Sequence, residues 1–160
     1  MIVVSDASPI INLASIGKLD LLPDLYGKII LPIAVFEEIT VAGAGQPGDA
    51  EVRTASWIEV RSCQNLQLVA ALSKEIDLGE AQAITLAIEM NCDWLIIDER
   101  LGRTKAKVSS LRVVGIIGIL LEAKQKQLLD NVTNQMDALI ANNFWIASEL
   151  YAEVKRIAGE

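Results

Sequence analysis

The chain has 160 residues, of which 52% are apolar and 4% aromatic, and it carries 14 Lys and Arg against 21 Asp and Glu, a net charge of −7. It contains no histidine, which excludes Ser-His-Asp and Cys-His nucleophiles, His-ligated zinc and imidazole acid–base catalysis. The length predicts one domain over residues 1–160, large enough to fold around a single core without metal or disulfide. Carboxylates, Lys, Tyr, Cys or backbone must therefore carry any proton transfer or metal binding.

Two cysteines, Cys63 and Cys92, are too few for a zinc ribbon or a disulfide scaffold, so we expect both to be reduced. The first residues, MIVVSDASP, lack the basic region of a signal peptide. The longest apolar run, 113–121, is about half as long as a membrane-spanning helix. We therefore expect a soluble, cytoplasmic protein.

In the first part of the chain, short β-branched runs predict strands at 2–5, 28–31 and 57–61. After the first strand, Ser8 is predicted to cap a helix whose first residue is Pro9 and which stops at Gly17. Pro32 opens a predicted helix over 33–40. The glycine-rich segment 41–50 is predicted to be a loop, followed by a short helix.

From Leu68 onward the pattern is helical, with a break near Ile76 and a restart at the next residue. The clearest strand, 93–98, follows. Next come a helix from Arg100, a strand at 112–115 and a helix over 117–127. Residues 130–160 are predicted to be a helical C-terminal extension. Strands that alternate with helices predict an α/β fold, with a parallel sheet covered by helices on both faces.

Four acids have positions that suit a shared site. Asp6 and Asp98 directly follow predicted strands, and ligands of open α/β sheets bind beyond the carboxyl ends of strands. Glu38 lies on the helix after the second strand, and Glu80 lies in the first turn of the helix before strand 93–98. Four carboxylates in one pocket would repel one another unless a cation held them, and Mg²⁺ or Mn²⁺ prefers such oxygen ligands. These ions support phosphodiester hydrolysis without histidine.

The segments that contain these acids are VVSDASPIINLASIG, VFEEI, LGEAQAITLA and LIIDERLGR. They resemble the four acidic motifs of PIN-domain nucleases, in particular the VapC-like toxin branch and its poorly characterised relatives, and the resemblance extends through almost the whole chain. It implies that Asp6, Glu38, Glu80 and Asp98 bind Mg²⁺ or Mn²⁺ and hydrolyse single-stranded RNA. It also implies a PIN-like three-layer α/β/α fold with a mostly parallel sheet of about five strands, a homodimer and, for the toxin branch, a small antitoxin protein.

Each acid also has a structural interpretation. Asp6 could be a turn residue, although Ser8 is the predicted cap, and Glu38 could be a solvated surface residue. Asp77 and Glu80 have the spacing of a capping box, so Asp77 is expected to be structural and Glu80 could be as well. Glu99, next to Asp98, is a candidate for a contact with metal-bound water.

Polar and basic residues near the acids complete the candidate site. Ser8 and Asn12 lie one helical turn apart and could contact a phosphate or a metal-bound water, but a cap and a buried amide explain them equally well. Five basic residues follow Asp98, and they are Arg100, Arg103, Lys105, Lys107 and Arg112. We expect Arg100 and Arg103 to neutralise the phosphates of RNA, although a solvated helix face is the usual role of such a run.

Other functions are weighed against the nuclease. A haloacid-dehalogenase-like phosphatase needs a second Asp two residues after the first, where this chain has Ser8, and a phospho-receiver needs adjacent acids where it has only Asp6. The net charge and the scarcity of aromatic residues argue against general nucleic-acid binding. The main alternative is a PIN-fold module that binds partners or dimerises with little or no nuclease activity.

Overall fold

A single parallel sheet organises the chain. The computed structural model describes residues 1–160. Its strands are β1 (Val3–Ser5), β2 (Ile29–Pro32), β3 (Ile58–Arg61), β4 (Trp94–Ile96) and β5 (Val113–Val114). They lie in the order β3-β2-β1-β4-β5, and every neighbouring pair is parallel. From β1, the strands β2 and β3 are added on one side, and β4 and β5 are then added on the other. The carboxyl ends of β1 and β4 therefore form the topological switch point, where ligands bind in such sheets.

Helices connect all the strands and continue after the last one. Before β4 the helices are α1 (Ala7–Ser15), α2 (Leu21–Tyr26), α3 (Ile33–Glu37), the π-helical turn η1 (Glu38–Ala42), α4 (Asp49–Thr54), α5 (Leu66–Leu72) and α6 (Leu78–Glu89). After β4 they are α7 (Arg100–Val108), α8 (Ile116–Gln125), α9 (Val132–Ala141) and α10 (Ser148–Ile157). No helix combines the length and the apolar character that crossing a bilayer requires.

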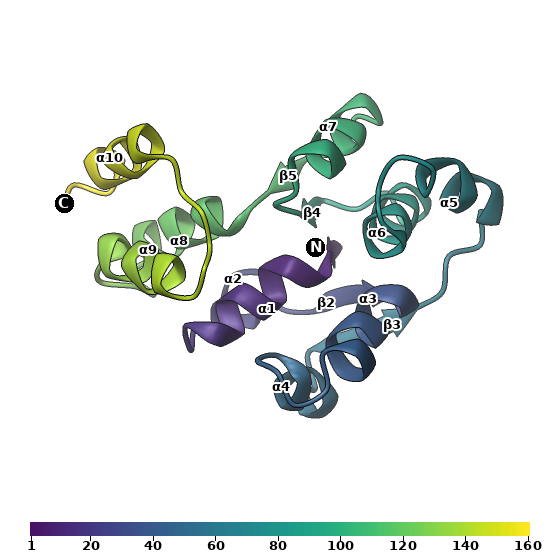
Figure 1. Ribbon diagram of the computed structural model, residues 1–160, viewed down its shortest axis with the longest axis horizontal. Coiled ribbons are helices and arrows are strands. Elements are labelled where there is room, and N and C mark those ends of the chain that lie inside the picture. Colours follow the sequence, from purple (N-terminus) through teal and green to yellow (C-terminus); the bar gives the residue numbers. More distant parts are fainter.

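Side chains alternate between two cores along the strands, as the pleat of a sheet requires. Val3 and Ile96 belong to the larger core, which also takes apolar residues from α1, α2, α8, α9 and α10. Val4 and Leu95 belong to the smaller core, formed with α5, α6 and α7. Figure 1 shows α8, α9 and α10 on one side of the strands and α5 and α6 on the other. The structure confirms the predicted three-layer α/β/α fold with a parallel five-stranded sheet and helices at the C-terminal end.

The predicted start of the first helix is wrong. Helix α1 begins at Ala7, its N-cap residue is Asp6, and Ser8 lies within the first turn. Pro9 is the third helical residue, a position where the missing N–H has no intrahelical acceptor to lose.

Two further differences concern the connections between strands. Helix α2 was not predicted, although it packs Leu22 into the larger core and ends at Gly27, whose φ of 75° favours glycine. The π-helical turn η1 extends into the predicted loop 41–50.

Candidate active site

Asp6 is fixed at the carboxyl edge of the sheet. Its backbone N–H donates to the carbonyl oxygen of Ile96 on the neighbouring strand (2.9 Å). The residue is 5% exposed, and its side chain makes no capping hydrogen bond. Burial raises the pKa of Asp6 to about 7, and the negative charges of Glu80, Asp77 and Glu38 add to the shift. Asp6 is therefore a buried acid surrounded by other acids.

Three of these acids converge over Gly79, in the first turn of α6. A Cβ atom on Gly79 would lie 3.5 Å from Asp6 Oδ1, Asp77 Oδ1 and Glu38 Oε2. No two of these oxygens are therefore separated by more than twice that distance. Because glycine has no side chain, the space between them is open, and we call it the Gly79 cradle. It brings together residues that are far apart in the sequence.

Glu38 reaches the cradle from the point where α3 gives way to η1. Burial of its carboxyl group and the negative charge of Asp77 raise the pKa of Glu38. A π-helical turn is rare and is frequent at functional sites, because it re-aims side chains without ending the helix. The local irregularity therefore lies at the residue that points to the acidic site.

Asp77 and Glu80 form the predicted capping box of α6. Asp77 Oδ1 accepts the N–H of Glu80 (2.8 Å), and Glu80 Oε2 accepts the N–H of Asp77 (3.2 Å). The second oxygen of Glu80, Oε1, is buried and has no hydrogen-bond partner in the protein. Burial, and then the negative charges of Asp77 and Glu99, raise the pKa of Glu80. The capping role is confirmed, and it still leaves one oxygen of Glu80 free.

Asp98 has a similar arrangement on the other side of the switch point. Its Oδ1 accepts the N–H of Ile116, the first residue of α8 (3.1 Å), while Oδ2 is buried without a partner. Burial raises the pKa of Asp98, and the Ile116 N–H and the positive charge of Arg103 oppose that shift. A Cβ atom on Gly115 would lie 2.3 Å from Oδ1, so only glycine leaves room for this carboxyl group.

Glu99 lies between the two acidic groups. Its negative charge raises the pKa values of both Glu80 and Asp98. It lines one surface cavity together with Asp77 and Glu80, and another together with Asp98. Glu99 is therefore the residue that joins the two halves of the site.

Three of the four predicted acids interact with one another, and with Asp77, around the first turn of α6. The Gly79 cradle contains Asp6, Glu38 and the unpredicted Asp77, with Glu80 as a charged neighbour. None of the acids of the cradle is among the groups that shift the pKa of Asp98. No set of three acidic or cysteine side chains has a geometry ready to hold a metal ion. The acids are gathered at one edge of the sheet, where the negative charge of Glu99 acts on both Glu80 and Asp98.

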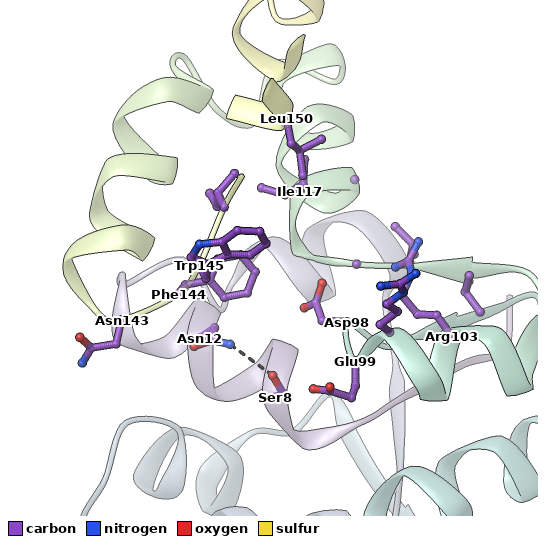
Figure 2. Close-up of a pocket in the computed structure, with 16 residues that line it drawn as sticks. Ser8, Asn12, Asp98, Glu99, Arg103, Ile117, Asn143, Phe144, Trp145 and Leu150 are labelled. Atoms are coloured by element: carbon purple, nitrogen blue, oxygen red, sulfur yellow. Dashed lines mark hydrogen bonds between the residues drawn. The ribbon is translucent and has the colours of Figure 1, made fainter. Parts of the chain in front are cut away.

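A cavity of about 900 Å³ opens beside Asp98. Ser8 and Asn12 line it from α1, and the side-chain amide of Asn12 donates to Ser8 Oγ (3.3 Å). Figure 2 shows Asp98 and Glu99 beside these two residues, with Arg103 across the cavity from them. The far wall is apolar and comes from α8 and from the connection between α9 and α10. The cavity therefore offers both charged and aromatic surfaces.

The basic stretch after Asp98 is split by the fold. Arg100 and Arg103 line the cavity, and Arg103 Nη1 also donates to the carbonyl oxygen of Ile97 (3.0 Å). Lys105 instead pairs with Glu75 on the surface. Arg112 lies over the ring of Trp94, 5.2 Å from its centroid. Of the five basic residues, only Arg100 and Arg103 therefore line the cavity, and their contact with RNA phosphates stays a prediction.

Several residues that line the site were not predicted from the sequence. Asp77 was interpreted only as a cap, whereas its carboxylate also borders the cradle. Gly79 and Gly115 were not singled out, because only tertiary contacts show what a side chain there would displace. Phe144 and Trp145, which form the aromatic wall of the cavity, were predicted only as part of the helical C-terminal extension. The one available signal was Gly79, which directly precedes Glu80 in the sequence.

A family model described as a PIN domain matches residues 2–160. The match covers all five strands and every candidate residue of the site. No curated protein matches the chain.

Proposed function

The chain belongs to the PIN-domain family, whose members are generally nucleases that typically use divalent metals, and we propose that it is a Mg²⁺- or Mn²⁺-dependent endoribonuclease acting on single-stranded RNA. The observation that carries the proposal is the set of buried carboxylates without a cation of their own at the switch point of the sheet. Such crowding is unfavourable in an isolated protein and becomes favourable when a divalent cation is bound.

The donor groups suit these ions. Carboxylate oxygens are the ligands that Mg²⁺ and Mn²⁺ prefer. Glu80 and Asp98 each have one oxygen held by a backbone N–H and a second, buried oxygen without a partner. The Gly79 cradle adds open space next to Asp6 and Glu38. We propose that Asp6, Glu38, Glu80 and Asp98 hold the ion or ions.

The remaining residues would position the substrate. When bound, the metal supplies a Lewis acid that activates water near neutral pH and stabilises negative charge on the phosphate. Arg100 and Arg103 line the adjacent cavity and would contact phosphate groups of the RNA. Ser8 and Asn12 would donate hydrogen bonds on the α1 side. Glu99 would orient water between the two acidic groups.

Cleavage of defined single-stranded RNA by the purified protein, with and without Mn²⁺, tests the proposal. We expect cleavage that depends on Mn²⁺ and is lost in the double variant Asp6→Asn, Asp98→Asn. These substitutions keep the size of each side chain and remove its charge. Cleavage that survives the double substitution would refute the proposed site.

A second candidate function is a PIN-fold module that binds partners or dimerises with little turnover. It is favoured by one observation: no three acidic or cysteine side chains together have the geometry to hold a metal ion. Titration calorimetry with Mn²⁺ separates the two functions. Binding of the ion supports the nuclease, and no binding supports the module.

Three further expectations, two from the resemblance and one from the length of the chain, stay predictions. They are the homodimer, the inhibition by a small antitoxin protein and a single domain over residues 1–160. Sedimentation measures the first, co-purification with the product of a neighbouring gene measures the second, and limited proteolysis measures the third.

A further inference from the structure

The connection between α9 and α10 holds a tryptophan in solvent beside the candidate active site. We call residues 143–147 the aromatic strap. Phe144 and Ile146 pack against the larger core, whereas Trp145 between them is 82% exposed. This alternation is that of an extended segment, in which successive side chains point to opposite sides. The two partly buried neighbours therefore anchor the backbone on either side of Trp145 and leave its indole in solvent.

Backbone hydrogen bonds fix the strap where it leaves α9. The N–H of Phe144 donates to the carbonyl oxygen of Leu139 (2.9 Å), and the N–H of Asn143 donates to that of Ile140 (3.1 Å). Asn143 has a φ of 69°, a left-handed conformation that asparagine tolerates and that turns the chain at a helix end. Because the backbone of the strap is already ordered, stacking of a ligand on Trp145 would cost the protein little conformational entropy.

Trp145 and Phe144 line the same cavity as Asp98 and Arg100. Figure 2 shows the two aromatic rings on the side of the cavity away from Arg103. The volume, about 900 Å³, lies within the range of cavities that take small organic ligands. An aromatic wall and a basic wall thus border a space large enough for a nucleotide.

The charge on the basic wall indicates what fits there. The guanidinium group of Arg100 makes no ion pair and no hydrogen bond within the protein, whereas most arginines of the chain have an acidic partner. A free guanidinium is complementary to a phosphate group, and an exposed indole is complementary to the face of a base. Single-stranded RNA presents both, one nucleotide apart or less.

We propose that Trp145 is a stacking platform for a base of single-stranded RNA, with the adjoining phosphate directed toward Arg100. The proposal rests on the proposed nuclease function and adds to it a binding residue for the nucleotide next to the cleaved bond. Stacking on an aromatic ring tolerates every base, because each has a π-face. The platform therefore provides affinity and register without strong sequence preference.

Binding without cleavage tests the platform. A fluorescein-labelled single-stranded RNA of mixed sequence is titrated with the full chain in EDTA at low salt, and anisotropy gives the Kd. We expect Trp145→Ala to weaken binding about 5- to 100-fold and Trp145→Phe to retain most of the affinity. Leu66→Ala is the matched control, because Leu66 is 70% exposed and lies on α5, on the other side of the sheet.

Tryptophan fluorescence gives a second reading of the same contact. RNA is expected to quench the emission of the wild-type protein, since the exposed indole would stack on a base. Trp145→Phe should lose this quenching while it still binds RNA. If Trp145 only supported the structure, Trp145→Phe would not lose the quenching while keeping its affinity for RNA.

Other outcomes would overturn the proposal. Wild-type protein that binds no RNA, or Trp145→Ala that binds as tightly as wild type, excludes the platform. If Trp145→Ala instead turns a dimer into a monomer without changing RNA affinity, the strap is a surface for a second copy of the chain. If wild type binds RNA through Trp145 but does not cleave it with Mn²⁺, the nuclease function fails and the platform stands.

Discussion

Acidic residues behave in opposite ways in two regions of the molecule. On the outer surface, Glu59 and Glu153 each lie beside an arginine, at 2.8 Å from Arg61 Nε and 3.0 Å from Arg156 Nε. Hydrogen bonds from these guanidinium groups lower the pKa values of both acids. At the switch point of the sheet, burial raises the pKa values of the acids, and neighbouring carboxylates raise them further.

The difference shows that Lys and Arg side chains pair with acids on the outer surface and not with most acids at the switch point of the sheet. The chain has 14 Lys and Arg, and none of its eight ion pairs includes one of the four predicted acids. Only Asp98, of the four predicted acids, has an arginine among the groups that shift its pKa. An acidic cluster without its own cation is stable only if a cation from outside joins it, which is the arrangement expected of a metal site.

The largest expected effect is on RNA cleavage, which should depend on the buried acids at the switch point and not on acids that pair with arginine. Asp6→Asn should reduce Mn²⁺-dependent RNA cleavage roughly 10³-fold, since metal-assisted charge stabilisation is worth several kcal/mol. Asp49→Asn is the matched control, because Asp49 is a partly buried acid outside the candidate site that pairs with Arg53. This variant should cleave at the wild-type rate. Equal activity of the two variants in a single-turnover assay would show that Asp6 is no more important for cleavage than Asp49.

Filling the Gly79 cradle should abolish metal binding without unfolding the protein. In Gly79→Ala the new methyl group would lie at ordinary contact distance from three carboxylate oxygens, where it would exclude an ion. Alanine favours helix, so the free energy of unfolding should stay unchanged or rise by up to about 1 kcal/mol. Calorimetry with Mn²⁺ and thermal unfolding measure the two effects. Wild-type Mn²⁺ affinity in this variant would show that the cradle is not the site.

The stability of the metal-free protein should fall as the pH rises. The pKa of Asp6 is about 7 in the folded state against its ordinary value of 3.8, so the folded protein retains a proton that the unfolded chain releases. The stabilisation is complete below about pH 4 and is lost as the pH rises through 7, an effect on the order of 4 kcal/mol.

Thermal unfolding from pH 4 to 8 with EDTA measures this trend. Asp6→Asn is the control, because it retains the pH dependence that comes from all other titrating groups. The variant should lose less stability than wild type over the range, and Mn²⁺ should restore wild type at pH 8. A parallel pH profile for the two proteins would contradict the assignment of the buried charge.

The smallest effect compares two helix caps. Asp77 caps α6 and belongs to the acidic group. Asn131 caps α9 outside that group, and its Oδ1 accepts the N–H of Asn134 (2.7 Å). Loss of such a cap costs about 1 kcal/mol. At pH 8 without metal, Asp77→Ala should destabilise less than Asn131→Ala, because it also removes a repelling charge. Urea unfolding of both variants decides this, and a larger loss for Asp77→Ala would mean that repulsion is unimportant.

Local patterns predicted the parts of the fold whose causes are local. The β-branched runs became strands, the strand at 93–98 was shortened only at its ends, and the Asp77–Glu80 spacing formed the capping box. The start of α1 was wrong because Ser8 and Pro9 are equally compatible with a cap and with a first helical turn. Helix α2 was not predicted, because a short segment that contains Pro23 is stabilised chiefly by packing.

The position of each acid after a strand or on a helix was determined by the sequence alone, since strand ends and helix starts are set by neighbouring residues. Tertiary structure alone decided which acids share a space, that Asp77 borders the Gly79 cradle, and that Asp98 lies beside Arg103. The physical reason is that burial and charge depend on distance in space, and helices from different parts of the chain meet at the edge of one sheet.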